Sequence, residues 1–379
     1  MADHSDDPLK ILPLDALHRR LGAKMMGFAG YDMPVHYPAG VLAEHNACRT
    51  GCALFDVSHM GQVALVPKSG DVADAALALE RLVPADIAIL KPGRQKYALF
   101  TNADGAIEDD LMVAHAGDRL VLVVNAGNKD ADMKILSAIE DAVDIIPIPR
   151  ALIAIQGPWS QAVLARLGAD VAATRFMDRF DLELLGHACW ATRSGYTGED
   201  GFEISLPLDG AEAITTALIE TGGAVPAGLG ARDSLRLEAG LCLHGSDIGP
   251  DTTPVEAQLM WSIPKSRRPE GARAGGFPGA DVIFDELARG PMRLRVGIKP
   301  DGRAPVRAPS ALYASPDADA PIGEVTSGSF GASVGGPVAM GYVLAAYAAD
   351  NTPLWAEVRG KRLPVRTAPL PFVPAQFKR

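Results

Sequence analysis

The stretch that most restricts the fold of this chain is residues 101–113, TNADGAIEDDLMV, in which three acids follow a turn and lead into an apolar run. The Asn, Asp and Gly of the turn, between apolar runs, are typical of a β-hairpin. Because side chains alternate along a strand, we expect Glu108 and Asp110 on one face and Asp109 on the other. A carboxylate that points inward must be paired, protonated or functional. The alternative is that all three acids are solvated turn residues.

Length and composition indicate a globular protein of more than one domain. With 379 residues, two or three compact units are expected. The net charge of −10 argues against a nucleic-acid backbone as the main partner, because phosphate binding needs a concentrated positive face. Four scattered cysteines do not form a disulfide framework, which favours a reducing compartment. The acidic start lacks the basic residues of a targeting peptide, and no stretch reaches the ~20 apolar residues of a membrane span. We therefore expect a cytoplasmic, bacterial protein.

Hydrophobic periodicity predicts an α+β chain with mainly antiparallel strands rather than a doubly wound parallel sheet. Residues 1–268 are expected to form two interleaved α+β domains. The stretch 269–291, which begins with a region rich in Gly, Ala and Arg, is expected to be a connector. Residues 292–379 are expected to form a C-terminal all-β domain, because short β-like runs alternate there with Gly/Pro turns. Helices are expected over 14–22, 40–50, 71–82, 128–142, 211–221 and 229–239, and a further helix is expected after a turn within 156–168. Strands are expected over 25–36, 53–67, 119–124, 152–155 and 187–206.

The segment 193–203, RSGYTGEDGFE, ends in a glutamate on a predicted strand. A carboxylate held at Glu203 suits a planar ligand with adjacent N–H donors, because two parallel charge-assisted hydrogen bonds fix the orientation of such a ligand. Tyr196 is placed to stack on the same ligand. In the alternative interpretation, the three acids of the segment are surface residues.

A second segment, 228–245 (GLGARDSLRLEAGLCLHG), puts Arg232 and Arg236 one helical turn apart on the same face. Such a pair is destabilising unless an anion lies near it. Asp233 and Glu238 supply that anion in one interpretation; in the other, an Arg near a helix start clamps a ligand carboxylate or phosphate. No Gly-x-Gly-x-x-Gly or Walker pattern occurs, so a nucleotide cofactor is disfavoured.

Residues 56–60, DVSHM, place a histidine beside an acid and a serine. A serine hydrolase of the α/β type would need a Gly-x-Ser-x-Gly elbow, which the chain lacks. A metal site would need ligands at paired spacing, which is also missing. We therefore expect His59 to be a structural histidine with satisfied hydrogen bonds, and we expect no metal.

Seven motifs together carry a family resemblance. They are AGYDMPVHY (29–37), LFDVSHMG (54–61), IEDDLMV (107–113), GYTGEDGFE (195–203), ARDSLRLEAGLCLHG (231–245), DTTPVEA (251–257) and LPFVP (370–374). In number and order they resemble the T-protein family of the glycine cleavage system, the aminomethyltransferases, from near residue 13 to the C-terminus. The resemblance implies a ring-like arrangement of three domains with a C-terminal barrel or jelly roll and tetrahydrofolate in the central opening.

The resemblance also implies a reaction and its partners. An aminomethyl group on the lipoyl arm of the H-protein is converted, with tetrahydrofolate, to ammonia and 5,10-methylenetetrahydrofolate, which leaves dihydrolipoyl H-protein. The essential acid of the family falls on Asp110. Ammonia departs only if the amine is protonated or the resulting cation is stabilised, and one buried carboxylate is able to orient folate and offset that cation.

The remaining roles that the resemblance implies concern folate. Glu203 would accept from the pterin amide and amino N–H groups, and Arg232 would meet the anionic end of the folate. Phe377 matches a position that is often tyrosine in relatives, so it keeps stacking and loses a hydroxyl contact. The full set of expected folate contacts is Glu203, Arg232, Tyr196, Tyr97, Met60, Asn125 and Phe377.

Two other folate-binding classes compete with this assignment. One is a folate-binding accessory protein of iron–sulfur assembly, whose Lys-Gly-Cys-Tyr-x-Gly-Gln signature is absent: residues 193–199 read RSGYTGE, without cysteine. The other is a folate-dependent subunit of a sarcosine-oxidase-like complex. The chain lacks the glycine fingerprint of a dinucleotide-binding domain, but a separately encoded subunit of such a complex would not need one. For the H-protein, which is often acidic, the basic residues Lys265, Arg267 and Arg268 suggest a docking edge.

Overall fold

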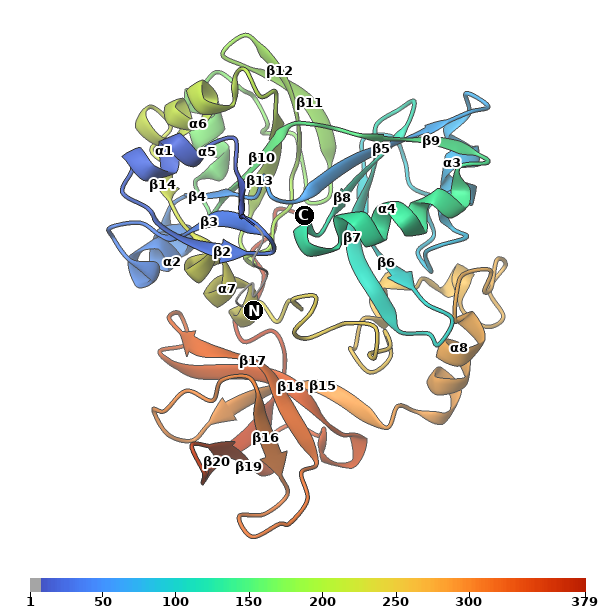
Figure 1. Ribbon diagram of the computed structural model, residues 1–379, viewed down its shortest axis with the longest axis vertical. Coiled ribbons are helices and arrows are strands. Elements are labelled where there is room, and N and C mark those ends of the chain that lie inside the picture. The colour runs from blue at the N-terminus through green and yellow to red at the C-terminus, as the bar shows by residue number, and fades with distance from the viewer. Residues whose placement is uncertain (1–7) are drawn as a thin grey trace.

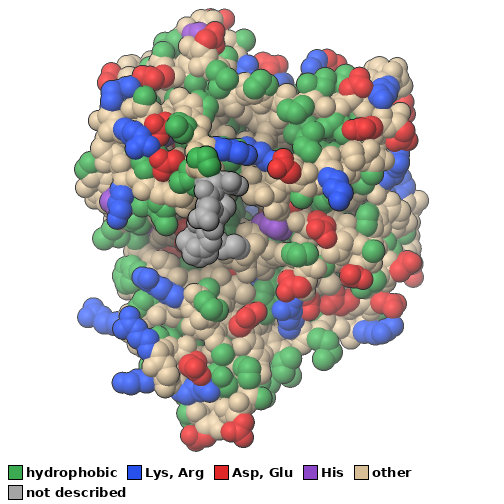
Figure 2. All heavy atoms as spheres, viewed as in Figure 1, with side chains coloured by type: hydrophobic (Ala, Val, Ile, Leu, Met, Phe, Trp, Pro, Cys, Tyr) green, Lys and Arg blue, Asp and Glu red, His purple; other side chains and the backbone are tan. Residues whose placement is uncertain are grey.

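Two open β-sheets and a closed barrel surround a common centre in the computed structural model, which describes residues 8–379 (Figure 1). The α+β class, the three-part arrangement and the C-terminal barrel expected from the sequence are confirmed. A small sheet of β1 (Lys10–Ile11), β3 (Tyr31–His36) and β2 (Lys24–Phe28) packs beside helix α7 (Leu229–Glu238). Figure 2 shows acidic and basic side chains interspersed over one face of the molecule.

A six-stranded sheet forms the first unit. Its order is β11 (Arg179–Leu184), β12 (His187–Thr192), β13 (Gly201–Leu206), β10 (Ala151–Gln156), β4 (Ala53–Asp56) and β14 (Val225–Pro226). Strands β4 and β10 are antiparallel neighbours, although the chain between them builds a different sheet. The apolar residues of these strands share a core with Leu17 of α1 (Asp15–Arg20), Leu164 of α5 (Ser160–Arg166) and Leu218 of α6 (Ala211–Glu220).

The chain between β4 and β10 folds into a five-stranded sheet. Its order is β6 (Gln95–Thr101), β7 (Ile107–His115), β8 (Leu120–Val124), β5 (Gly61–Pro67) and β9 (Val143–Pro147). The pairing of β6 with β7 confirms the predicted hairpin, and Leu99 lies opposite Asp110. Helices α3 (Val72–Leu79) and α4 (Lys129–Leu136) bury Leu79 and Leu136 against this sheet. Short 3-10 turns flank α4, namely η1 (Ala126–Asn128) and η2 (Ser137–Ile139).

Helix α8 (Ala280–Arg289) lies within the stretch expected to be a connector, and its start supports the acidic hairpin. Thr101 Oγ1 donates to the Pro278 carbonyl at 2.8 Å. Gly279, with φ +70°, lies so close to the backbone of Gly105 and Asn102 that a Cβ atom would not fit. The short turns η3 (Met260–Ser262) and η4 (Lys265–Arg267) come before this helix. The hairpin is therefore held at its tip as well as along its strands.

The C-terminal barrel is closed. Its strand order is β15 (Arg293–Pro300), β18 (Gly336–Leu344), β17 (Gly323–Gly331), β16 (Ser310–Tyr313), β19 (Pro353–Val358) and β20 (Lys361–Ala368), with the turn η5 (Ala345–Tyr347) after β18. Helix α7 joins the barrel to the first unit. Ala231 and Leu235 pack with α2 (Val41–Thr50) and the six-stranded sheet, whereas Leu237 packs against Val338 and Met340 of β18.

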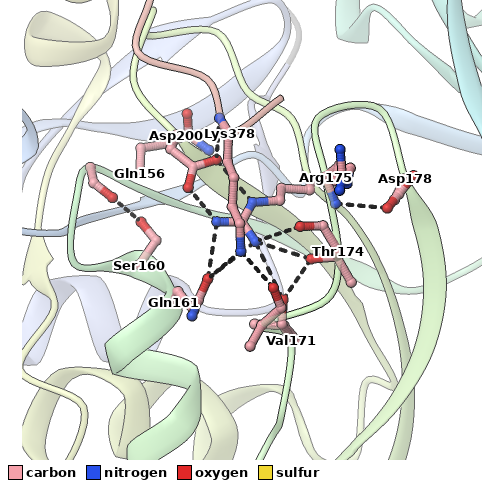
Figure 3. A network of polar contacts seen from close by, with 12 residues as sticks. Gln156, Ser160, Gln161, Val171, Thr174, Arg175, Asp178, Asp200 and Lys378 are labelled. Atoms are coloured by element: carbon pink, nitrogen blue, oxygen red, sulfur yellow. Dashed lines mark hydrogen bonds and ion pairs between the residues drawn. The ribbon is translucent and has the colours of Figure 1, made fainter.

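The residues after β20 run back from the barrel to the first unit, so that the C-terminus lies at the centre of Figure 1. The backbone N–H of Gln376 donates to the Gly198 carbonyl at 2.8 Å. Figure 3 shows the polar network that receives Lys378, whose Nζ donates to Gln161 Oε1 at 3.2 Å. The same Gln161 oxygen accepts from the buried guanidinium of Arg193 at 3.3 Å. The tail is thus fixed to the sheet unit by both backbone and side-chain contacts.

Five strands and one helix of the described residues were not predicted. Strands β1 and β14 have only two residues each. Strands β9 and β11 lie at sheet edges, and in both the side chains that face solvent interrupt the apolar alternation. Strand β16 spans only Ser310–Tyr313, which is too short for a periodic signal. Helix α8 was hidden by the glycines before it. In the part of the chain that the structure describes, no helix combines the length and the apolar character that a bilayer crossing requires.

Candidate functional site

The predicted catalytic residue, Asp110, lies just beyond the point where the β7–β8 ladder ends. The last pair of that ladder is Leu111 with Val124, which brings Asn125 next to Asp110. The Asn125 side-chain amide donates to Asp110 Oδ1 at 2.8 Å and to Asp109 Oδ1 at 2.7 Å. One amide therefore holds both acids, and two of the predicted site residues meet.

Asp109 and Asp110 point to opposite faces of the hairpin, as the strand alternation predicted. Asp110 lies opposite Leu99 and is half-buried, whereas Asp109 lies opposite Phe100 and is fully buried. The pKa of Asp110 is raised to about 6, mainly by burial and next by the charge of Asp109. The interpretation of the three acids as solvated turn residues is wrong for Asp109 and for Asp110.

Tyr97, also a predicted site residue, comes two residues before Leu99 on β6 and so shares the face of Asp110. Its hydroxyl is near enough to Asp110 to lower the pKa of that carboxyl by hydrogen bonding. Burial, followed by the Asp110 charge, raises the pKa of Tyr97 well above its usual value, so the phenol stays neutral. The Tyr97 ring packs at 5.1 Å on Trp261, whose side chain is largely exposed.

Two residues behind the acids were missed by sequence reasoning. His244 Nδ1 lies 3.0 Å from Asn128 Nδ2 and 3.7 Å from Asp109 Oδ1. Asp132 comes from α4 and is 1% exposed, and burial together with the Asp109 charge raises its pKa to about 9. Asp132 belongs to the polar first turn of its helix, where acids are ordinarily solvated. Only the packing of α4 on the sheet distinguishes it.

Glu203, Arg232 and Tyr196 gather on a second side of the site. The Glu203 carboxylate accepts from Ser194 Oγ at 3.1 Å. The Arg232 guanidinium lies over the Tyr196 ring, 5.0 Å from its centroid. Burial lowers the pKa of Arg232, and the nearby Glu203 charge opposes that shift. Within residues 8–379, Arg232 Nη1 is buried without a hydrogen-bond partner. The charges of Arg232 and Glu203 are therefore close enough to interact.

The internal-anion interpretation is correct for Arg236. Its Nη1 lies 2.6 Å from Asp247 Oδ2, and its Nη2 lies 2.8 Å from Asp233 Oδ1. Glu238, the other anion considered, pairs instead with Arg49 at 2.8 Å. Of the two helix arginines, Arg236 therefore belongs to the structural framework.

The acids of the segment 193–203 also divide into structural and available groups. Glu199 pairs with Arg49 at 2.9 Å, and Asp200 pairs with Arg193 at 2.5 Å. Both pairs are largely buried, so Glu199 and Asp200 are not the surface acids of the alternative interpretation. Glu203 makes no ion pair of this kind in the described part of the chain, which leaves it available to a ligand.

His59 does not have the satisfied hydrogen bonds that we expected. It is 5% exposed, and its Nδ1 atom has no hydrogen-bond partner among residues 8–379. Its ring meets Phe28 and Tyr31 edge-on, and burial, with the charge of Arg232, lowers its pKa to about 3. Met60, a predicted folate contact, packs at the edge of the cluster between sheet and α7. Residues 8–379 contain no group of three or more potential metal-ligating side chains.

Phe377, the most C-terminal of the predicted contacts, lies in the tail fixed at the sheet unit. Its ring stacks on Phe176 with the centroids 4.0 Å apart and the planes 4° from parallel. The backbone on both sides is anchored, through Gln376 as described and by the Lys378 carbonyl, which accepts from the Phe176 N–H at 2.7 Å. The aromatic ring is thus positioned by the protein itself.

Of the three basic residues suggested as a docking edge, Arg267 is withdrawn from the surface, and the docking of an H-protein there stays a prediction. Arg267 is 5% exposed, and its Nη1 lies 3.3 Å from Glu80 Oε2. Arg268 donates from Nε to the Ile263 carbonyl at 2.7 Å. Only Lys265 of the three is exposed. Two of the basic side chains stabilise the turn around η4, and the partner of Arg267 could not be predicted locally because Glu80 is far away in the chain.

Comparisons with known proteins agree with this geometry. The GCVT N-terminal domain family matches residues 14–267, and the family of the glycine cleavage T-protein C-terminal barrel domain matches residues 293–374. The mitochondrial aminomethyltransferase of Dictyostelium discoideum is 41% identical over 99% of this chain and 95% of its own length. The mitochondrial aminomethyltransferase of Gallus gallus is 43% identical over 97% of this chain and 94% of its own length.

A solved structure gives the same result. The glycine cleavage system aminomethyltransferase T from Bartonella henselae superposes with a TM-score of 0.90 and 44% identity, covering 98% of this chain and 100% of its own. Fold, sequence and domain order therefore agree along nearly the whole chain. The chain belongs to the glycine cleavage T-protein family and is an aminomethyltransferase of the glycine cleavage system.

Proposed function

We propose that this aminomethyltransferase acts on an aminomethyl group carried by the lipoyl arm of an H-protein and that tetrahydrofolate accepts the one-carbon unit. The observation that carries the proposal is the half-buried Asp110 carboxyl, whose pKa is raised to about 6, held by Asn125 beside Tyr97. The family to which the chain belongs supports folate as the co-substrate. The products are ammonia, 5,10-methylenetetrahydrofolate and the dihydrolipoyl H-protein.

Glu203 and Arg232 are proposed to bind the pterin together. A carboxylate accepts two hydrogen bonds from adjacent N–H groups in a fixed plane. The Arg232 Nη1 that lacks a partner is a donor beside it, and it suits the ring carbonyl of the same heterocycle. Tyr196 under the guanidinium keeps that group in place. This assignment replaces the expectation that Arg232 meets the anionic tail of folate.

Asp110 is proposed to act on the reacting carbon. As the amine departs, positive charge develops there, and a carboxylate in a partly desolvated site offsets that charge. The same carboxylate accepts a proton from the attacking folate nitrogen, for which a pKa near the working pH is suited. The protonated aminomethyl thioether loses its C–N and C–S bonds, and two C–N bonds to folate form. The two hydrogens from the folate nitrogens end on the released thiol and on ammonium.

Replacing Asp110 with Asn tests this role. We expect Asp110→Asn to lower turnover at least about 100-fold, because both the charge and the proton acceptor are lost, while the KM for tetrahydrofolate changes less than about threefold. The measurement is ammonia and methylenetetrahydrofolate release from aminomethylated H-protein. Asp104→Asn, an exposed acid in the same turn, is the matched control and retains full turnover. Unchanged turnover in Asp110→Asn would remove the residue from the mechanism.

The state of the cysteine thiols is the basis for proposing the cellular compartment of the protein. All four cysteines are buried and unpaired, which suits a reducing compartment such as the cytoplasm. The names of both relatives quoted above include the mitochondrion, whose matrix is also a reducing compartment. Fractionation of the native cells, with detection of the chain by mass spectrometry, distinguishes a cytoplasmic location from others.

A further inference from the structure

Asp109 and Asp132 form a buried carboxyl pair behind the reaction centre, for which the mechanism above has no use. Asp109 is 0% and Asp132 is 1% exposed. Asp109 Oδ2 and both Asp132 oxygens are buried and accept no hydrogen bond from any donor within residues 8–379. Three orphaned carboxylate oxygens at one place would cost several kcal/mol if both groups were ionised, so such a pair retains a proton.

The surroundings of the pair decide where the proton resides. Asp109 Oδ1 accepts a hydrogen bond from the Asn125 amide at 2.7 Å, so this carboxyl has a donor from another side chain. Asp132 has no such donor, and burial, the Asp109 charge and a hydrogen bond to Asp109 raise its pKa to about 9. At neutral pH Asp132 is therefore the neutral acid that donates to Asp109.

We propose that Asp132 is a positioning residue of the transfer reaction: the proton it holds keeps Asp109 anionic and fixed, and Asp109 in turn makes Asp110 a base of suitable strength. The inference rests on the proposed role of Asp110. The contacts run in three steps: from Asp132 of α4 to Asp109 on the core face of β7, from Asp109 to Asn125, and from Asn125 to Asp110 on the opposite face. The groups that face the pair and Asp110 are His244, Asn128, Asn125, Tyr97, Tyr196 and Cys242.

The chain of contacts predicts which substitutions at residue 132 are tolerated. Asp132→Asn retains the shape and an N–H donor for Asp109, and so preserves its charge. Asp132→Leu removes the donor and leaves a buried Asp109 oxygen without a partner, which favours protonation of Asp109. Asp109→Asn removes the charge directly. In the last two variants the pKa of Asp110 falls toward its ordinary value, because the neighbouring negative charge no longer raises it.

The experiment is a pH profile of kcat with aminomethylated H-protein and tetrahydrofolate. In Asp132→Asn, we expect the acid limb within about 0.3 pH unit of the unmodified protein and turnover within about threefold. In Asp132→Leu and Asp109→Asn, we expect the acid limb to move about one unit or more to lower pH and the plateau to fall about tenfold or more, because a weaker base accepts a proton less well. Asp130→Asn, an exposed acid on the same helix, changes neither quantity.

A merely structural role for Asp132 would lower turnover without moving the acid limb. An unmoved acid limb in Asp132→Leu and Asp109→Asn overturns the proposal, as does an Asp132→Asn variant that loses as much turnover as Asp132→Leu. If Asp132→Leu does not fold, the comparison of Asp109→Asn with Asp132→Asn decides alone.

A second measurement does not depend on the reaction. In protein labelled with ¹³C at the aspartate carboxyl, one carboxyl resonance is expected to remain that of the acid form at pH 7 and to disappear in Asp132→Asn. If the unmodified protein shows this resonance but no folate-dependent turnover, the proposed function fails while the proton on Asp132 stands. If turnover is present and no protonated aspartate is found, the inference about Asp132 fails and the proposed function remains.

Discussion

Asp109 and Asp110, adjacent on one strand, have different proposed roles at the reaction centre. Asp109 is enclosed between the hairpin and α4, where it accepts a hydrogen bond from Asn125 and lies 3.7 Å from His244 Nδ1. Asp110 is half-buried on the opposite face, where Tyr97 is the neighbouring side chain. One position along the strand thus separates a charge that stays fixed from a carboxylate that substrate is able to reach.

The raised pKa of Asp110 predicts the pH dependence of turnover. The carboxylate is the active form, so kcat is expected to be constant above about pH 7 and to fall close to tenfold per unit below about pH 6. The measurement is kcat from pH 5 to 8 at constant ionic strength with saturating substrates. An acid limb centred near the ordinary aspartate value of about 4 would contradict it.

The same shift has a cost in stability with a defined sign. The folded protein binds the Asp110 proton more tightly than the unfolded chain does, so the group's contribution to stability is fully present below about pH 4. That contribution is lost as pH rises through the folded pKa of about 6. Asp110→Asn is therefore expected to melt at a higher temperature than the unmodified protein at pH 8, and the difference disappears near pH 4.

The sequence predicted this part of the site well because strand alternation and a turn signal are local. The faces of Asp109 and Asp110 followed from period-two alternation alone. What local patterns did not contain was the burial of Asp132 and the position of His244, since both depend on how α4 and the loop after α7 pack against a distant hairpin. The family resemblance, and not the pattern, singled out Asp110 from its two neighbours.

Helix α7 is the element on which the molecule is assembled. One face carries Arg232 toward the site, and another carries Leu237 into the barrel core. Arg236 passes between them to Asp247, which is 1% exposed. Asp247 also accepts from Thr326 Oγ1 at 2.5 Å on β17. The helix therefore couples the geometry of the ligand contacts to the docking of the barrel.

Removal of the Asp247 carboxylate tests this coupling. Asp247→Ala leaves the buried Arg236 guanidinium without its internal counter-charge, which is expected to lower the free energy of unfolding by about 3–5 kcal/mol. Asp233→Ala removes the exposed partner of the same arginine and is expected to cost at most about 1 kcal/mol. Both values come from denaturant unfolding curves followed by circular dichroism. Equal losses in the two variants would show that the buried ion pair contributes no more to the free energy of unfolding than the exposed one.

At the scale of this element, periodicity located α7 within a residue or two and predicted that Gly240 follows its end, where it has a φ of +67°. Periodicity did not assign the two arginines, because like residues on one face have the same local signature. Their different roles come from Asp247 and Glu203, which other parts of the chain supply. Edge strands such as β11 were missed for a related reason, as their exposed faces carry polar residues.

In the whole molecule, the barrel contacts the first unit along α7 and through Ser333, which bonds to His45 and Arg49 of α2, and the returning tail forms a second, separate attachment. The second attachment consists of the Phe377 ring on Phe176 and the Lys378 contacts of Figure 3. Short apolar runs predicted a barrel, but no pattern in the sequence predicted that residues after it would return. The return depends on partners such as Gln161 and Gly198, which lie far away in the chain.

Shortening the tail tests the second attachment. Deletion of residues 375–379 removes the stacked ring and the polar anchor, and is expected to lower the free energy of unfolding by about 2–4 kcal/mol. Limited proteolysis is then expected to cleave between the first unit and the barrel sooner than in the full chain. Gln376→Ala is the control, because only its backbone bonds to Gly198. Equal proteolysis rates for the deletion and the full chain would show that the tail does not fix the barrel.

The nesting of the five-stranded sheet between β4 and β10 has a consequence for the order of folding. The two strands cannot pair until the long chain between them has been drawn together, and closing so long a loop is entropically costly. Asp110 belongs to the nested sheet, whereas Glu203 and Arg232 belong to the unit around it. Neither half has a site by itself. During refolding, secondary structure therefore returns before catalysis does, and the recovered activity measures the moment at which the two halves dock.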